Sequence, residues 1–370
     1  MKHYKVIHLK DMVASNPSHL SSGERMIGLN SKCYFTKMNN FSSSSSSDKQ
    51  ISFKNFFFLI WDIISADIIH LNNGRSLVGD YKFEMPDDSA TKKNIKTVYN
   101  FILSFLIGLD ILFLRLIGKK VFVMFQGSDG RIGGYCRKSF KYTHCKVINY
   151  GTYSDKADKL KLKKIYRMSR WANYLFSVNP DVLHNLGQNK SFIPYTSINF
   201  NEWTKNFTSR TPNSVRVIAH APTDSNIKGT MYIEAALNEL KQEGYKFEYK
   251  KIQNIPHSQI KSFFNNIDLL IDQCLTGWYG GVSVEVMSLG IPSMAYIRDK
   301  DLKYLSEDFK SELPIINANP NNLKNKIKEF LSLNDEEYLK LSQKSYTFIK
   351  KYHSEKEVAK LVNEFYQKEL

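Results

Sequence analysis

The strongest constraint on the fold is a repeated alternation of strand-like and helix-like segments in the second half of the chain. Runs of β-branched and apolar residues predict strands at 214–219, 246–251, 268–271 and 293–297. Helices are predicted at 231–240, 257–265, 282–289, 322–333, 335–351 and 355–369. Strands that alternate with helices form parallel sheets with right-handed crossovers that cover both faces. This half is therefore expected to be an α/β domain.

The first half shows the same alternation in a less regular form. Strands are predicted at 4–9, 32–36, 67–71, 120–125, 146–150 and 173–178. The serine run at 42–47 has nothing to bury and is expected to be a loop. The polar stretch at 199–213 predicts the domain boundary. We expect α/β domains at 1–200 and 201–353, with a helix at about 354–370 able to pack back on the first.

The composition excludes several classes of protein. The cysteines, which are Cys33, Cys136, Cys145 and Cys274, are too scattered for a disulfide framework or a CxxC metal site. Their pattern favours a reducing, cytoplasmic environment. No secretory signal is recognised, and no run reaches the roughly 18 unbroken apolar residues of a membrane span. The chain is therefore expected to be a cytoplasmic globular protein.

The formal net charge of +16 attracts anions. The basic residues include a cluster at Lys156, Lys159, Lys161, Lys163, Lys164, Arg167 and Arg170. No zinc-finger, RNP-like or basic-zipper pattern accompanies them, so no nucleic-acid partner is expected. The apolar segments at 56–61 and 99–117 are expected to be mostly core helix. An exposed part of them, with the basic cluster, would suit peripheral docking on an anionic membrane.

One strand-to-helix turn carries a lysine and a glycine. Lys228 and Gly229 lie between the predicted strand at 214–219 and the helix at 231–240. The N–H groups and the dipole at a helix N-terminus attract an anion, which the lysine can bind as well. In isolation this lysine would be read as a solvated loop residue. In this setting it suits a diphosphate leaving group, which gains negative charge as its bond breaks.

A second turn of the same kind contains Gly280 and Gly281. Successive glycines permit positive φ and a nest of amides for phosphate or sugar oxygens, although a plain turn would also accept them. Glu285 is expected in the first turn of the next helix. A carboxylate there either accepts paired hydroxyls or offsets the helix dipole.

These turns, at 220–230 and 272–292, resemble the retaining glycosyltransferases of family 4, close to a bacterial polysaccharide-type branch. The matching letters are HAP, KGT, DQ, GWYG and the glycine-proline ending of the second segment. The resemblance implies the GT-B fold, in which two Rossmann-like domains with parallel sheets face a central cleft. It also implies a nucleotide-sugar donor bound by Lys228, Gly229, Thr230, Asp272, Tyr279, Gly280, Gly281 and Glu285, with Glu285 on the ribose. The base is placed near 252–256 by position alone.

Weaker motifs extend the resemblance over nearly the whole chain, at 67–71, 74–77 and 126–131. The turn formed by Gln126, Gly127, Ser128 and Asp129 resembles a His-Gly-x-Asp turn that lies near the reacting sugar in relatives. Gln126 and Asp129 therefore join Lys228 as expected catalytic residues, with Gly127 and Ser128 on the cleft side. Gly23, in a Gly-Glu-Arg segment, is expected either to face the acceptor or to belong to a helix start.

The chain departs from the family pattern at three places. Gly277 stands where many members have a glutamate, Gln126 where a histidine is common, and Ser225 near the position of an absent arginine. A competing Asp-x-Asp motif, at 299–301, has the form used for metal-bound diphosphates in another glycosyltransferase fold. It is read as a charged surface loop, so no metal site is expected.

The predicted function is retaining transfer of a sugar from a nucleotide-diphosphate-sugar to a saccharide or lipid-linked saccharide, in surface polysaccharide synthesis. The nucleotide-sugar is a co-substrate, and no cofactor is expected. Three alternatives stay open: a non-catalytic nucleotide-sugar-binding or scaffold protein, a nucleotide-sugar epimerase of the same fold, and, on charge alone, a nucleic-acid-binding protein.

Overall fold

The computed structural model describes residues 4–12, 15–38, 48–196, 198–199, 203, 215–253, 255, 257–264 and 266–370. The chain divides into two compact units. The first comprises Met1–Ser139, Asn149–Thr196 and Glu355–Leu370, and the second comprises Phe140–Ile148 and Ser197–Ser354. The chain therefore enters the second unit twice and returns to the first for its last helix. The polar stretch predicted as a boundary lies largely outside the described residues.

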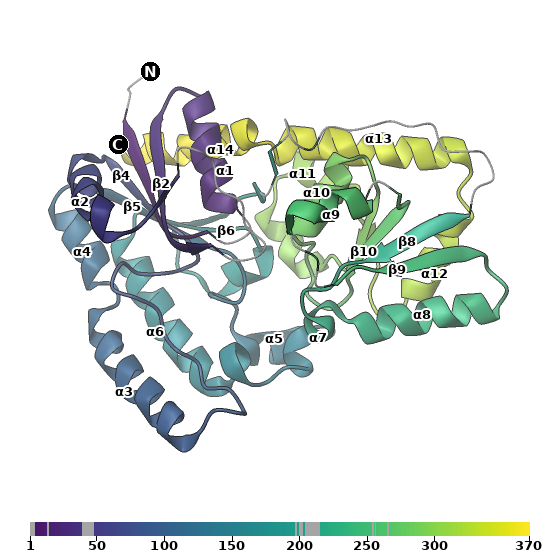
Figure 1. Cartoon of the computed structure of the whole chain (residues 1–370), viewed down its shortest axis with the longest axis horizontal. Coiled ribbons are helices and arrows are strands. Elements are labelled where there is room, and N and C mark those ends of the chain that lie inside the picture. Colours follow the sequence, from purple (N-terminus) through teal and green to yellow (C-terminus); the bar gives the residue numbers. More distant parts are fainter. Residues whose placement is uncertain are drawn as a thin grey trace. The chain divides into compact units, whose positions relative to one another are not determined.

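The first unit is built on a seven-stranded parallel sheet in the order β3-β2-β1-β4-β5-β6-β7 (Figure 1). Its strands are β1 (Lys5–Met12), β2 (Asn30–Met38), β3 (Lys49–Gln50), β4 (Ile68–Leu71), β5 (Lys120–Phe125), β6 (Tyr174–Ser177) and β7 (Lys190–Phe192). The central strands are buried along almost their whole length, as expected of a parallel sheet covered on both faces. The α/β prediction for this half is confirmed.

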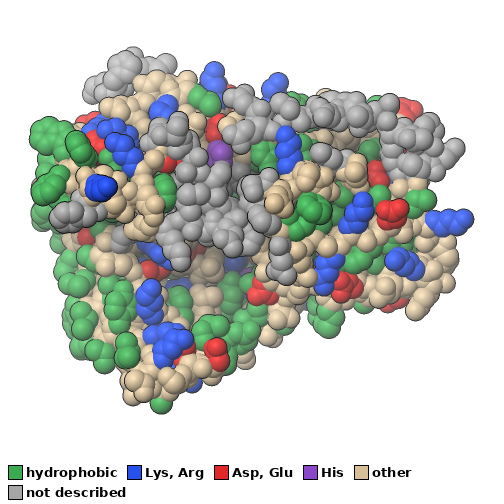
Figure 2. Space-filling view, viewed as in Figure 1, with side chains coloured by type: hydrophobic (Ala, Val, Ile, Leu, Met, Phe, Trp, Pro, Cys, Tyr) green, Lys and Arg blue, Asp and Glu red, His purple; other side chains and the backbone are tan. Residues whose placement is uncertain are grey.

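Helices cover both faces of this sheet. They are α1 (Asn16–Met26), α2 (Phe56–Ser65), α3 (Ala90–Leu106), α4 (Leu109–Leu116), α5 (Gly133–Ser139), α6 (Asp155–Trp171) and α14 (Glu355–Glu369), with short 3-10 turns at Phe53–Asn55, Gly151–Tyr153 and Pro180–Asn185. Serine side chains cap two of them: Ser89 accepts from the Lys92 amide, and Ser154 from the Ala157 amide. Apolar side chains are exposed along α2, α4 and α3 (Figure 2).

The second unit has a five-stranded parallel sheet in the order β12-β11-β10-β8-β9. Its strands are β8 (Arg216–His220), β9 (Phe247–Lys251), β10 (Leu269–Gln273), β11 (Ser293–Ala295) and β12 (Ile316–Asn317). Its helices are α7 (Ser225–Lys228), α8 (Thr230–Gln242), α9 (His257–Phe264), α10 (Gly281–Ser288), α11 (Glu307–Glu312), α12 (Leu323–Leu331) and α13 (Asp335–Tyr352), with 3-10 turns η2 (His144–Lys146) and η5 (Asp299–Tyr304). Ile218, Leu237, Ile271 and Ile327 belong to the core between its layers.

The prediction of a strand at 146–150 is wrong. Its first residue ends η2, and Val147 closes that turn with its amide bonded to the His144 carbonyl at 2.9 Å. The segment Phe140–Ile148 belongs to the second unit, whereas Asn149 and Tyr150 belong to the first. A segment that leaves its sheet in this way has no neighbouring strand with which to pair.

The last helix packs within the first unit. Val358, Ala359, Val362 and Tyr366 of α14 are buried there. The Tyr366 hydroxyl donates to Glu24 of α1 at 3.0 Å and contacts Nδ1 of His70 on β4 at 2.6 Å. The parallel register of β1 and β4 places His8 beside His70, and their rings stack at 4.8 Å. This buried polar network fastens α14 to α1 and to the sheet.

Candidate functional site

Lys228 is the last residue of α7, in the segment that connects β8 to α8. Asp224 caps α7 by accepting from the Asn226 and Ile227 amides at 2.9 and 3.1 Å. Gly229 then takes a left-handed conformation, with φ of 76°, and α8 begins at Thr230. A Cβ on Gly229 would lie 2.5 Å from the sulfur of Cys274, which follows β10, so both the turn and this close approach require glycine.

Asp272 joins this turn to the following one. Its carboxylate forms an ion pair with the Lys228 ammonium and accepts from the Gly280 amide at 2.6 Å and the Ser283 hydroxyl at 2.8 Å. Lys228 is only 8% exposed, and Asp272 is fully buried. A Cβ on Gly280 would lie 3.2 Å from the Lys228 ammonium. The lysine-bearing and glycine-bearing turns of the second unit therefore converge.

The two glycines act differently from the prediction. Gly280 is the N-cap of α10 in an extended conformation, with φ of −99° and ψ of 178°, and Gly281 is already helical. Neither takes positive φ, so the predicted nest of that geometry is wrong. The N-terminus of α10 instead places its dipole beside the Lys228–Asp272 pair, and glycine at 280 leaves room for the ammonium.

Glu285 and Thr230 lie in the helices that begin at these turns. Glu285 is buried in α10, in the second turn rather than the predicted first. The Thr230 hydroxyl bonds Nε2 of His220 at 2.8 Å, and Nδ1 of His220 donates to the Ile271 carbonyl at 2.7 Å. Burial, assisted by the nearby Lys228 charge, lowers the pKa of His220 to about 4. Thr230 is thus held by a neutral histidine between β8 and β10.

Tyr279 does not join this group. Its ring is fully buried against Trp278, and its hydroxyl bonds Nε2 of His353 at 2.9 Å. The structure gives it a core role at the end of α13, so the expected donor contact is not supported. The expected base-binding stretch at 252–256 includes Asn254 and Pro256, which lie outside the described residues.

In the first unit, the predicted catalytic turn follows β5. Gly127 has φ of 146°, and Asp129 accepts from the Gln126 amide at 3.0 Å and the Gly127 amide at 2.6 Å. Burial raises the pKa of Asp129. The Gln126 carbonyl accepts from Asn179 at 2.5 Å. The Asp129 carboxylate therefore shapes this turn.

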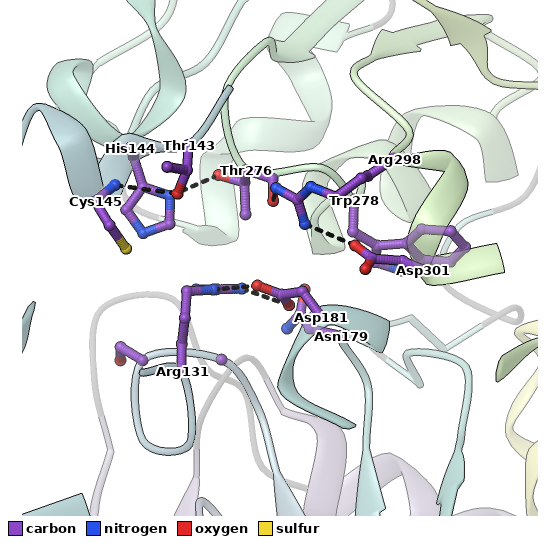
Figure 3. Close-up of polar contacts among 12 residues, drawn as sticks. Arg131, Thr143, His144, Cys145, Asn179, Asp181, Thr276, Trp278, Arg298 and Asp301 are labelled. Atoms are coloured by element: carbon purple, nitrogen blue, oxygen red, sulfur yellow. Dashed lines mark hydrogen bonds and ion pairs between the residues drawn. The ribbon is translucent and has the colours of Figure 1, made fainter. Parts of the chain in front are cut away.

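Sequence reasoning missed the charged residues that support the turn. Arg131 donates from Nε and Nη2 to Asp181 at 2.5 and 3.1 Å, as Figure 3 shows. The ammonium of Lys161 bonds the carbonyl of Arg131 and, at 3.4 Å, that of Ser128. Arg131 ends the motif at 126–131, and that position could have identified it. Lys161 belongs to the predicted lipid-docking cluster, but Lys161 and Lys164 are both fully buried, so they cannot face a membrane.

Gly23 lies apart from these turns in the first unit. It is in the middle of α1, where a Cβ would lie 2.1 Å from the Glu355 carbonyl oxygen of α14. Both interpretations, as a turn facing an acceptor and as a helix start, are therefore wrong, and the residue permits the close packing of α1 on α14.

Arg298 lies next to Gly277, the position at which many members of the family that the sequence resembles have a glutamate. Gly277 has φ of 88°, and a Cβ there would lie 2.4 Å from the Arg298 guanidinium carbon. That guanidinium donates to Asp301 at 2.7 Å and to the Thr276 carbonyl at 2.9 Å (Figure 3). Asp301 is fully buried, so the interpretation of 299–301 as a surface loop is wrong for this residue.

Arg298 lies after β11, the strand next to β10, and this placement was the available signal. The same region of the second unit contains His144, whose Nδ1 lies 3.3 Å from the Thr276 hydroxyl (Figure 3). The guanidinium also lies 3.6 Å from the centre of the Phe140 ring. The segment Phe140–Ile148 therefore packs against the loop after β10.

No family model matches the chain, and no curated protein matches it in sequence. Solved structures match it over essentially its whole length. HepE of Anabaena in complex with UDP-glucose has a TM-score of 0.55 and 11% identity, covering 99% of this chain and 100% of that one. A glycosyltransferase from Rickettsia africae has a TM-score of 0.56 and 13% identity, covering 100% and 99%.

A third similar structure is an alpha-glucosyltransferase in complex with UDP and a DNA 13-mer. Its TM-score is 0.56 at 10% identity, and the match covers 98% of this chain and 99% of that one. At these identities the likeness concerns the fold. The chain has two parallel sheets with flanking helices, as in these GT-B glycosyltransferases, and the predicted fold class is confirmed.

Proposed function

We propose that this chain is a glycosyltransferase that moves a sugar from a nucleotide-diphosphate-sugar to a saccharide or lipid-linked saccharide. The observation that most directly supports this proposal is that Lys228 and the N-terminus of α10 meet at Asp272 in the second unit. A diphosphate beside them would meet an ammonium and the positive end of a helix dipole together. The structures that share the fold include one in complex with UDP-glucose.

Lys228 and α10 stabilise the leaving group in this reaction. As the bond between the anomeric carbon and the diphosphate oxygen breaks, both electrons go to that oxygen, and its new negative charge meets the ammonium. Asp272 orients the ammonium before the donor binds. Glu285 is proposed to accept from the ribose hydroxyls, and Gly229 and Thr230 to shape the turn around the phosphates.

Transfer is proposed to retain configuration. The acceptor oxygen attacks the anomeric carbon from the face that the diphosphate leaves, and its proton passes to a departing phosphate oxygen. No protein base is then required. The rest of the rate enhancement comes from holding the donor and the acceptor in the reactive geometry. The turn at Gln126, Gly127, Ser128 and Asp129 is proposed to contact the reacting sugar. Because Lys228 and α10 supply the positive charge, we expect transfer to persist in chelator, which a turnover assay with EDTA measures.

The proposed setting is the cytoplasm, with the acceptor at the membrane in surface polysaccharide synthesis. Exposed apolar helices in the first unit motivate the peripheral membrane location. A lipid-linked acceptor has its saccharide at the headgroup level, within reach of an enzyme bound to that surface.

The donor assignment is tested by exchanging Lys228 for alanine. A thermal-shift screen of nucleotide-sugars first identifies the donor, and turnover of that donor is then measured. Lys228→Ala should lower the rate by about 10²–10³-fold with the fold intact, because one charge-stabilising group is lost. Lys344→Ala, at an exposed position of α13, is the matched control and should keep wild-type turnover. Wild-type turnover in the Lys228 variant would show the proposal to be wrong.

A non-catalytic nucleotide-sugar-binding protein is the second candidate. The observation that favours it is Arg298, which packs beside Gly277 where many relatives carry a glutamate. Such a protein would bind the donor in the thermal-shift screen but neither hydrolyse nor transfer it. Donor hydrolysis by the wild-type chain that is lost in Lys228→Ala excludes this candidate.

A further inference from the structure

The first unit exposes an unusual amount of apolar surface on α2. Phe57 is 76% exposed, Trp61 68% and Phe58 65%. The same helix buries Leu59 and Asp62 toward the sheet. Soluble proteins rarely expose aromatic side chains so close together without a partner. This helix therefore presents an apolar face outward while its other face packs on the unit.

Helices α3 and α4 continue this surface. Their inner positions, at Leu103, Ile107, Ile111 and Leu114, are buried in the unit. Their outer positions are also apolar, and the exposed side chains are Ile95, Val98, Phe101, Ile102, Phe105, Leu109, Phe113 and Leu116. A helix that is apolar on both its packed side and its outer side is typical of one that meets a second apolar environment.

The stretch Ala90–Leu116 is long and apolar enough to cross a membrane by length and composition. Two features place it along a surface instead. Gly108 has φ of 91° and separates α3 from α4, and the Arg167 guanidinium donates to the Ile107 carbonyl at that break. The inner face of both helices packs on the unit, which leaves only their outer face for lipid.

The charges that border this surface are mostly positive. Lys54, Arg115, Lys163 and Arg170 are exposed, and the Lys163 ammonium lies 5.7 Å from the centre of the Phe105 ring. Helix α3 contains no acidic residue.

The acidic residues of α2 and α4 are turned inward. Asp62 is held by Lys5 and Lys32 at 2.6 and 2.9 Å, and Asp110 accepts from Ser76 at 2.7 Å. Beside α3, a pocket of about 260 Å³ is lined by Lys82, Lys93 and Lys156, with one acidic residue, Glu84. The surroundings therefore attract an anionic partner.

We propose that α2, α3 and α4, with the exposed residues Leu162, Lys163, Tyr166 and Arg170 of α6, form a membrane face that docks on the headgroup layer of an anionic bilayer. Phenylalanine and tryptophan with lysine and arginine beside them are typical of helices that lie in this layer. Protein interfaces, in contrast, are depleted in lysine. The proposal names the location of the acceptor of the proposed function, but it does not depend on the donor site.

The test is flotation of the full-length chain with vesicles of phosphatidylcholine alone or mixed with phosphatidylglycerol. The wild-type chain should float with the mixed vesicles and roughly tenfold less with neutral ones, and high salt should reduce binding. Phe57→Asp with Trp61→Asp should lower flotation by roughly tenfold or more, because charges replace inserted side chains. Lys163→Glu with Arg170→Glu should lower binding to the mixed vesicles and not to neutral ones.

The controls separate this proposal from others. Leu339→Asp changes an exposed leucine on α13 in the second unit and should bind as wild type. Both membrane-face variants should keep the wild-type melting temperature and the donor-induced thermal shift. A loss of vesicle binding in these variants can therefore be told apart from a loss of donor binding. Wild-type flotation of both variants, or no flotation of the wild type, overturns the proposal. A lipid-free dimer that Phe57→Asp with Trp61→Asp dissociates would make this surface a protein interface, which also overturns it.

Discussion

At the residue scale, His220 shows how a buried polar side chain positions the turn that carries Lys228, where we propose that the donor binds. It bridges the Ile271 carbonyl and the Thr230 hydroxyl, and burial holds its pKa at about 4 against an ordinary value of 6.5. In the folded protein the His220 side chain is therefore neutral at pH values above about 4. Between pH 6.5 and 4 the unfolded chain binds this proton and the folded chain does not, so stability falls as pH is lowered through this window.

His220→Gln should flatten this pH dependence. The wild-type histidine is expected to contribute up to about 3 kcal/mol of the loss of stability between pH 6.5 and 4, because burial lowers its pKa from 6.5 to about 4. Urea unfolding of both proteins at several pH values measures the difference. Parallel curves for wild type and His220→Gln would mean that the folded histidine is not held neutral.

The convergence of the lysine-bearing and glycine-bearing turns could be predicted from the sequence because it follows from topology. Lys228 and Gly280 come after β8 and β10, which are neighbours in a parallel sheet, and carboxyl ends of such strands share one edge. Tyr279 and Gly23 could not be assigned in this way. Their roles depend on contacts between segments far apart in sequence, such as Tyr279 with His353, which no local pattern reports.

At the element scale, long buried strands were predicted well and short edge strands were not. The bounds of β5 agree with the prediction because its five apolar residues, Val121–Phe125, lie between Lys120 and Gln126. The two-residue β3 and the three-residue β7 were missed, since they carry too few residues to show a pattern. Val147 and Ile148 resemble a strand, but their segment crosses to the second unit.

The close packing of α1 on α14 determines whether an alanine at position 23 stabilises or destabilises the protein. Replacing glycine by alanine within a helix normally stabilises it by roughly 0.5–1 kcal/mol. In Gly23→Ala the new Cβ would lie 2.1 Å from the Glu355 carbonyl oxygen, and overpacking costs about 1–3 kcal/mol or more. We therefore expect net destabilisation, measured by urea unfolding. Ser22→Ala, on the same helix, is the control and should change stability little. A stabilised Gly23→Ala would contradict this close contact.

At the scale of the whole molecule, the order of elements along the chain does not follow the two units. The chain contributes Phe140–Ile148 to the second unit before that unit's sheet begins, and it returns to the first with α14. Each sheet is nevertheless parallel and has its own core. The stability of the first unit therefore depends on the end of the chain, whereas Lys228, Asp272 and Gly280 all belong to the second.

Deleting residues 355–370 tests this dependence. Val358 and Val362 alone bury side chains worth about 1.5–3 kcal/mol each, and Tyr366 bonds the buried Glu24. Their combined loss is comparable with the roughly 5–15 kcal/mol that stabilises a typical domain. We expect amide hydrogen exchange to accelerate by orders of magnitude in β1 and β4 and to change little in β8 and β10. Removing Leu370 alone, which is exposed, should leave both patterns unchanged. Equal acceleration in both sheets would show that α14 supports the whole chain rather than the first unit.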